Sequence, residues 1–249
     1  MKRIERKHLK ENELAHQLES VRNYLEPRSN SLTKIALFVL VALMVVVAIT
    51  VWRQRNAARG EEALAQAMVA LNAQVVPAGV EGAEGLPAAA QVGATGTFAT
   101  EEAKLNAALP KLKTAADAYP DTDAGIQARY HLAGALAALG RHDEAIATFE
   151  DVTKRAGNDS LYGRMARLGK ADAQARAGQL DAAIASWKAM ATEEAEELPA
   201  DAILMDLAKA YVQKGNTEEA RKAFTEIVDK HPQSPYTAQA RAELENLKG

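Results

Sequence analysis

The side chains with the widest chemical capacity in this chain are its five histidines, His8, His16, His131, His142 and His231. An imidazole can bind a metal ion or transfer a proton near neutral pH, but either role requires a partner that orients the ring. No two of these histidines have metal-ligand spacing on one predicted helix, and the chain contains no cysteine. The sequence therefore predicts neither a metal site nor a catalytic centre at these residues.

Other catalytic signatures are missing as well. The sequence contains no glycine-rich phosphate-binding loop and no nucleophile elbow. The densest run of carboxylates is typical of a solvated face or turn, and it comprises Glu193, Glu194, Glu196 and Glu197. The acidic balance of the long domain also argues against nucleic acid as a partner. We therefore expect a protein that is not an enzyme, needs no cofactor, has no small-molecule substrate and binds other proteins.

Residues 35–52 form an apolar segment of eighteen residues without a charge. At ~1.5 Å per residue a helix of this length spans roughly 27 Å, which is enough to cross the hydrocarbon layer. A buried core helix is disfavoured because soluble helices rarely carry apolar residues on every face. A cleaved signal peptide is disfavoured because the segment ends in Trp52, Arg53 and Gln54 rather than in small residues. We predict a transmembrane helix over 35–52 that contacts the lipid bilayer.

The chain before this segment, residues 1–34, is a basic tail. It carries eight Lys/Arg and five Glu, whereas the chain after the segment carries twenty-two Lys/Arg and twenty-eight Asp/Glu. Basic residues favour the cytoplasmic side, so the tail is predicted to be cytoplasmic and the domain to lie across the membrane. An apolar stripe predicts a short amphipathic helix in the tail, formed by Leu14, Leu18, Val21 and Leu25. A coiled-coil contact, docking on a partner, a place on the lipid surface and a helix that orders only in context all stay open.

The domain after the apolar segment contains an internal repeat. Glycine recurs at spacings of 38 and 37 residues, and an alanine and an aromatic residue follow each glycine at fixed distances. The recurring residues are Gly140, Gly178 and Gly215, then Ala145, Ala183 and Ala220, then Phe149, Trp187 and Phe224. The glycine allows one helix to end at positive φ, the alanine lets two helices cross closely, and the aromatic ring fills the space between them. Such hairpins bury their apolar faces only against neighbours, so we expect a stack.

These residues resemble the tetratricopeptide repeat, a helical hairpin of about 34 residues. The best match has its signature positions at Leu204, Leu207, Ala208, Tyr211, Gly215, Ala220, Phe224, Ile227 and Pro232. The resemblance implies an all-α fold, in which the N-terminal transmembrane helix precedes a right-handed helical-repeat solenoid of about four helix pairs and a capping helix. The expected parts are a degenerate first repeat over 57–120 with a flexible insert over 73–99, repeats over 125–155, 161–195 and 201–232, and a capping helix over 235–248. Whether the first helix of residues 57–72 continues the transmembrane helix is open.

Several positions depart from the family pattern. Arg167, Lys170 and Gln174 fall where large apolar residues are usual, so we expect the first helix of the middle repeat to be shifted by one position. The shifted helix would bury Met165, Leu168, Ala171 and Ala175. Pro110 is expected to kink the second helix of the first repeat or to mark its start. No β-branched alternation indicates a strand in this domain.

Tetratricopeptide stacks present a concave surface formed by their first helices, which implies candidate protein-binding residues. By that geometry the candidates are Tyr130, His131, Gly134, Met165, Leu168, Asp172, Met205, Asp206 and Lys209. For Met165 and Leu168 the favoured alternative is a place in the core. The Lys and Asn set with which some members clamp a terminal carboxylate is absent, since Tyr130 and Gly134 stand at two of its positions. We expect the surface to bind helices or unfolded segments rather than a charged peptide end.

The order of short tail, single span and four-repeat domain is similar to that of the ancillary subunit of the bacterial Sec translocon. This resemblance implies a single-pass protein of the bacterial inner membrane with a cytoplasmic N-terminus and a periplasmic C-terminal domain. The implied function is a membrane-tethered adaptor or scaffold that links the translocon to periplasmic chaperones. Two alternatives stay open, namely a structural accessory subunit of a large membrane complex and an envelope-assembly scaffold.

Overall fold

The computed structural model describes residues 29–76, 97–192 and 199–247. The predicted amphipathic helix of the tail, most of the insert and the carboxylate run at 193–197 therefore lie outside the described residues. The chain divides into two compact units, Met1–Arg55 and Asn56–Gly249, each of which is described by itself.

The first described element is the helix α2, Ser29–Leu71, which contains the predicted transmembrane segment. Its large apolar side chains from Ile35 to Trp52 are exposed, with Phe38 74% and Trp52 63% accessible. By length and composition it is the one helix among the described residues that could cross a membrane. The hydroxyl of Thr50 donates to the carbonyl oxygen of Val47 at 2.8 Å, so this polar group is satisfied within the helix. Residues 56–71 of α2 belong to the second unit.

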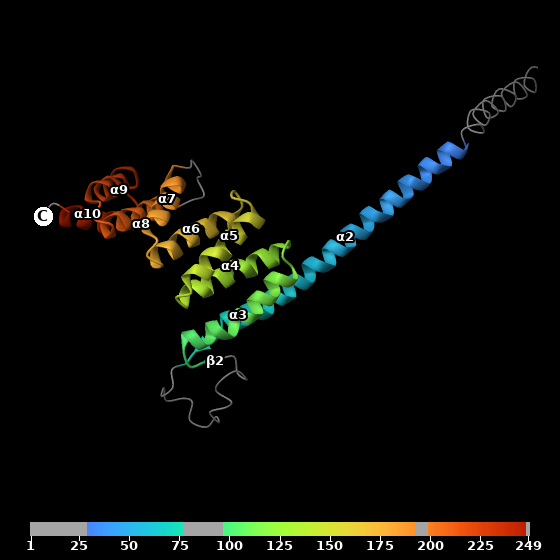
Figure 1. The fold of residues 1–249 in the computed structure, drawn as a ribbon, viewed down its shortest axis with the longest axis horizontal. Coiled ribbons are helices and arrows are strands. Elements are labelled where there is room, and N and C mark those ends of the chain that lie inside the picture. The colour runs from blue at the N-terminus through green and yellow to red at the C-terminus, as the bar shows by residue number, and fades with distance from the viewer. Residues whose placement is uncertain (1–28, 77–96, 193–198, 248–249) are drawn as a thin grey trace, which may run out of the picture. The chain divides into compact units, whose positions relative to one another are not determined.

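The second unit is a series of helical hairpins that follow one another in chain order (Figure 1). After residues 56–71 come α3 (Glu101–Ala118), α4 (Asp123–Ala138), α5 (His142–Ala156), α6 (Leu161–Arg176), α7 (Leu180–Ala191), α8 (Ala200–Gln213), α9 (Thr217–Lys230) and α10 (Thr237–Asn246). From α3 to α10 each helix contacts the next in the chain, and α4 also contacts α6. The predicted all-α repeat solenoid is confirmed.

The ends of the insert pair with each other, which the sequence did not predict. The strands β1 (Gln74–Val75) and β2 (Thr97–Phe98) are parallel, with Gln74 opposite Thr97 and Val75 opposite Phe98. The amide of Val76 also donates to the carbonyl oxygen of Phe98 at 2.9 Å. Two residues are too few to give an alternating pattern, so only the packing of residues 64–71 against α3 brings these segments together.

The recurring glycines end the first helices of the last three hairpins, as predicted. Gly140, Gly178 and Gly215 have φ of 75°, 77° and 78°. After each glycine the next amide donates back across the turn, as Arg141 does to the carbonyl oxygen of Leu136 at 2.9 Å. The glycine amides donate to the carbonyl oxygens of Ala137, Ala175 and Val212. This pair of bonds satisfies carbonyl groups at the helix end and requires the left-handed conformation that glycine adopts without strain.

The position of Pro110 corrects one of the two expectations for α3. The helix begins at Glu101, where the hydroxyl oxygen of Thr100 accepts from the amide of Ala103 at 3.1 Å. Pro110 therefore lies inside the helix and does not mark its start. The threonine cap fixes the start because its hydroxyl satisfies an amide that has no partner within the helix.

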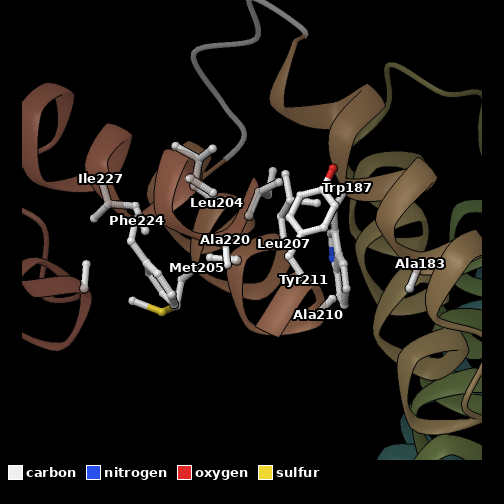
Figure 2. Packing of buried hydrophobic residues seen from close by; sticks show 14 of the residues in the cluster. Ala183, Trp187, Leu204, Met205, Leu207, Ala210, Tyr211, Ala220, Phe224 and Ile227 are labelled. Atoms are coloured by element: carbon white, nitrogen blue, oxygen red, sulfur yellow. The ribbon is translucent and has the colours of Figure 1, made fainter. Parts of the chain in front are cut away.

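The core of the last hairpins matches the signature positions. Figure 2 shows Trp187 of α7 with Leu204, Leu207 and Tyr211 of α8, which form one hydrophobic cluster with residues of α9. Phe224 and Ile227 are fully buried in it. Burial of such side chains contributes about 1.5–3 kcal/mol each to stability, so this hairpin carries a large share of the stabilisation.

The middle hairpin does not adopt the predicted shifted register. Gln174 is buried, whereas Met165, Leu168 and Ala175 are only partly buried, and Ala171 alone of the expected set is fully buried. The hydroxyl of Ser186 donates to Oε1 of Gln174 at 3.2 Å, which gives the buried amide a partner. The register is therefore that of the neighbouring repeats, and a hydrogen bond replaces an apolar contact.

Candidate protein-binding face

The predicted site residues lie on three first helices, α4, α6 and α8. Leu168 and Asp172 are four residues apart on α6, which places them on one side of that helix. The corresponding residues are Tyr130 and His131 on α4 and Asp206 and Lys209 on α8. We call this set, with Leu168 and Asp172, the first-helix face.

An aromatic cluster occupies the α4 end of this face. The ring centroid of Tyr130 lies 5.6 Å from that of His131, 5.8 Å from that of Phe149 and 5.6 Å from that of Tyr162. Such tilted and edge-on arrangements stabilise ring pairs beyond the area they bury. Tyr162 was not among the predicted residues. The alignment on glycine places Leu168 opposite Tyr130, and only the packing of α6 beside α4 brings Tyr162 to the cluster.

Partial burial shifts the ionisation of this cluster towards neutral forms. Burial raises the pKa of Tyr130, and the neighbouring Tyr162 adds to the rise. Burial lowers the pKa of His131. The imidazole is therefore uncharged at neutral pH, and the α4 end of the face presents apolar and hydrogen-bonding groups without charge.

The α6 and α8 part of the face carries charges. Asp172 forms an ion pair with Arg176 at 3.1 Å within α6. Loss of surrounding water raises the pKa of Asp206, Lys209 opposes this rise, and the charge of Asp172 adds to it. Asp206 is nevertheless exposed at the surface. A carboxylate that solvent reaches, yet that nearby protein partly desolvates, is typical of a concave surface.

Two of the predicted residues fit the face poorly. Met205 is 1% exposed and belongs to the same hydrophobic cluster as Phe224 (Figure 2), so its side chain is part of the core. The sequence could not separate these roles because Met205 and Asp206 are neighbours and either could point to the surface. Met165 is partly buried and has no recorded contact with the aromatic cluster. Gly134 is exposed, and a Cβ there would meet open space.

Metal binding has no candidate within the described ranges, where no group of three or more His, Cys, Asp or Glu side chains converges. The histidine His142 begins α5 and His231 follows α9, so neither meets the first-helix face through its own helix.

The tetratricopeptide repeat family model matches residues 99–168 and 174–244 of the chain. The nearly identical TPR-like repeats of a putative kinesin light chain from Podosopora anserina are similar in structure, with a TM-score of 0.50 and 19% identity over 58% of this chain and 77% of that chain. A tetratricopeptide repeat protein from Parabacteroides merdae gives a TM-score of 0.49 and 18% identity over 60% of this chain and 56% of that chain. At these identities the likeness concerns the fold alone. No curated protein matches the sequence.

Proposed function

Because this chain belongs to the tetratricopeptide repeat family, whose repeats act as scaffolds for protein–protein interaction, we propose that its first-helix face binds segments of partner proteins beside a membrane. The fold is typical of non-catalytic scaffolds. The observation that carries the proposal is the combination of an uncharged aromatic cluster with the partly desolvated carboxylate of Asp206 on neighbouring first helices. An apolar residue of a partner fits the rings, and a hydrogen-bond donor or a cation fits the carboxylate.

Tethering to the membrane rests on α2. An exposed apolar surface of this length in water would drive aggregation, whereas in a bilayer the same side chains face hydrocarbon. We propose a single-pass protein of the bacterial inner membrane with its N-terminus in the cytoplasm and the repeats in the periplasm. A reporter fused after Gly249 tests this orientation. Activity of a periplasm-dependent reporter is expected, and activity of a cytoplasm-dependent one would contradict it.

The proposed partners are the Sec translocon on one side and periplasmic chaperones on the other. This choice follows from the order of tail, span and repeats, which is similar to that of the translocon's ancillary subunit. The adaptor would hold a chaperone near the point where unfolded chains emerge, which increases its effective concentration there.

Site-specific photo-crosslinking tests the proposal in the membrane. A photoreactive residue replaces Lys209 on the first-helix face, and the matched control replaces Lys188, an exposed lysine of α7. We expect crosslinks to translocon subunits or chaperones from position 209 and few from position 188. Crosslinks from position 209 to some other assembly would support a protein-binding face and overturn the translocon link. Equal crosslinking from both positions would overturn the face itself.

A further inference from the structure

A polar pocket of about 420 Å³ lies between α5, α6 and α7, away from the first-helix face. Its lining residues are Glu150, Thr153, Lys154, Asn158, Arg167, Lys170, Ser186, Ala189 and Met190. Arg167 and Lys170 are three residues apart on α6, and they lie on the side of the helix opposite Leu168 and Asp172, since each residue turns the helix by about 100°. The pocket and the first-helix face can therefore be occupied independently.

The polar lining replaces what is apolar core in the next hairpin. Arg167, Lys170 and Gln174 stand 37 residues before Leu204, Leu207 and Tyr211, which are all buried (Figure 2). Charged side chains at such positions lose part of their hydration and require a compensating partner. Lys170, for example, retains only 29% of its side-chain exposure.

The protein's own compensation is incomplete. Glu150 is the one carboxylate among the lining residues, and it pairs with Lys154 at 3.1 Å and with Lys170 at 3.4 Å. The hydrogen bond from Lys154, followed by the charge of Lys170, lowers the pKa of Glu150, so the carboxylate is ionised and shared between both lysines. With Arg167 the lining therefore holds three cationic groups against one anionic group.

We propose that this pocket binds a small multivalent anion of the phosphate or polycarboxylate class. The cations supply charge-assisted hydrogen bonds, the amide of Asn158 is a neutral donor at the rim, and Ala189 and Met190 line the rest. A volume of about 420 Å³ is within the usual range for small-molecule sites. The proposal concerns a ligand and goes beyond the protein-binding function, because its residues lie outside the first-helix face.

Isothermal titration of the full chain in non-ionic detergent tests the proposal, with pyrophosphate and citrate as separate probes at constant ionic strength. We expect saturable binding of at least one probe, and the two titrations distinguish phosphate from carboxylate ligands. Lys154→Met and Lys170→Met should each weaken binding about tenfold, which corresponds to the loss of one charge-assisted bond. Glu150→Gln should strengthen binding several-fold, because it removes the competing carboxylate. Lys188→Met is the matched control and should leave binding unchanged.

Three results would overturn the proposal. They are no saturable heat with either probe, weaker binding by Glu150→Gln, and equal effects of Lys188→Met and Lys154→Met. Lys154 is 70% exposed, so its substitution leaves the fold intact and keeps the test valid if Lys170→Met unfolds the hairpin. The fluorescence of Trp187, which is buried on α7, reports whether each variant is folded.

Discussion

The Nε of Arg129 lies 3.1 Å from Oδ2 of Asp151, and the same guanidinium reaches Oδ1 of Asp117 at 3.1 Å and the carbonyl oxygen of Ala116 at 3.0 Å. One side chain of α4 thereby connects α3 and α5. Arg129 is 7% exposed at its side chain, whereas Asp117 and Asp151 are 52% and 41% exposed.

This asymmetry predicts unequal effects for the two ways of breaking the network. The double substitution Asp117→Asn and Asp151→Asn leaves a buried cation without an ionic partner and should lower the free energy of unfolding by about 2–4 kcal/mol. Arg129→Met leaves two solvated carboxylates and should cost only about 0–2 kcal/mol. Urea unfolding followed by Trp187 fluorescence in a Trp52→Phe background measures both. A larger loss for Arg129→Met would contradict the predicted order.

Gly169 of α6 is predicted to be sensitive to a single methyl group. A Cβ at this position would lie 2.5 Å from the ring of Phe149, which is itself 4% exposed and packed against Tyr130. We expect Gly169→Ala to destabilise the domain by about 1–2 kcal/mol, since overpacking outweighs the gain in helix propensity. Gly134→Ala in α4 is the control, because a Cβ there meets open space. It should stabilise the domain by about 0.5–1 kcal/mol.

The stability of the domain should depend on His131 in weakly acidic solution. Burial lowers the pKa of this imidazole below its ordinary value of 6.5, so the unfolded chain binds the proton more tightly than the folded one. Its contribution is therefore complete above about pH 6.5 and is lost as the pH falls towards the folded pKa. Urea unfolding between pH 5 and pH 7.5 should show this decline, and His131→Phe should flatten it. An unchanged slope in the variant would assign the decline to other groups.

Asp206 predicts the opposite sign. Its pKa is raised above the ordinary 3.8, so the folded state favours the protonated form and stability falls as the pH rises through the folded pKa. Asp206→Asn should therefore raise the midpoint of thermal unfolding at pH 7 and have little effect below pH 3.8. Asp229→Asn, at an exposed position of α9, is the control. A lower midpoint for Asp206→Asn at neutral pH would show that the carboxylate stabilises the domain.

The repeats could be predicted from the sequence because their physical causes are local. A glycine at positive φ, a small residue at a helix crossing and an aromatic residue one turn later recur at fixed distances, and the structure places Gly178, Ala183 and Trp187 as expected. Long apolar segments are equally legible, since residues 35–52 need no partner to specify a helix.

Other features depend on contacts between segments and left no local signal. Gln174 is buried because Ser186 of the next helix supplies its hydrogen bond, so a rule that places polar residues outside fails there. Tyr162 reaches Tyr130 only through the packing of α6 beside α4. The binding role of the first-helix face stays a prediction, although Met205 is excluded from it by burial.

The pairing of β1 with β2 has a consequence for engineering the protein. Because Gln74 is held opposite Thr97, the two ends of the intervening sequence are fixed by their own hydrogen bonds. The entropy of closing a loop grows only slowly with its length, at roughly 0.6 kcal/mol per doubling. Residues 77–96 are therefore a suitable place to graft an epitope, a protease site or a fluorescent label without disturbing the hairpins.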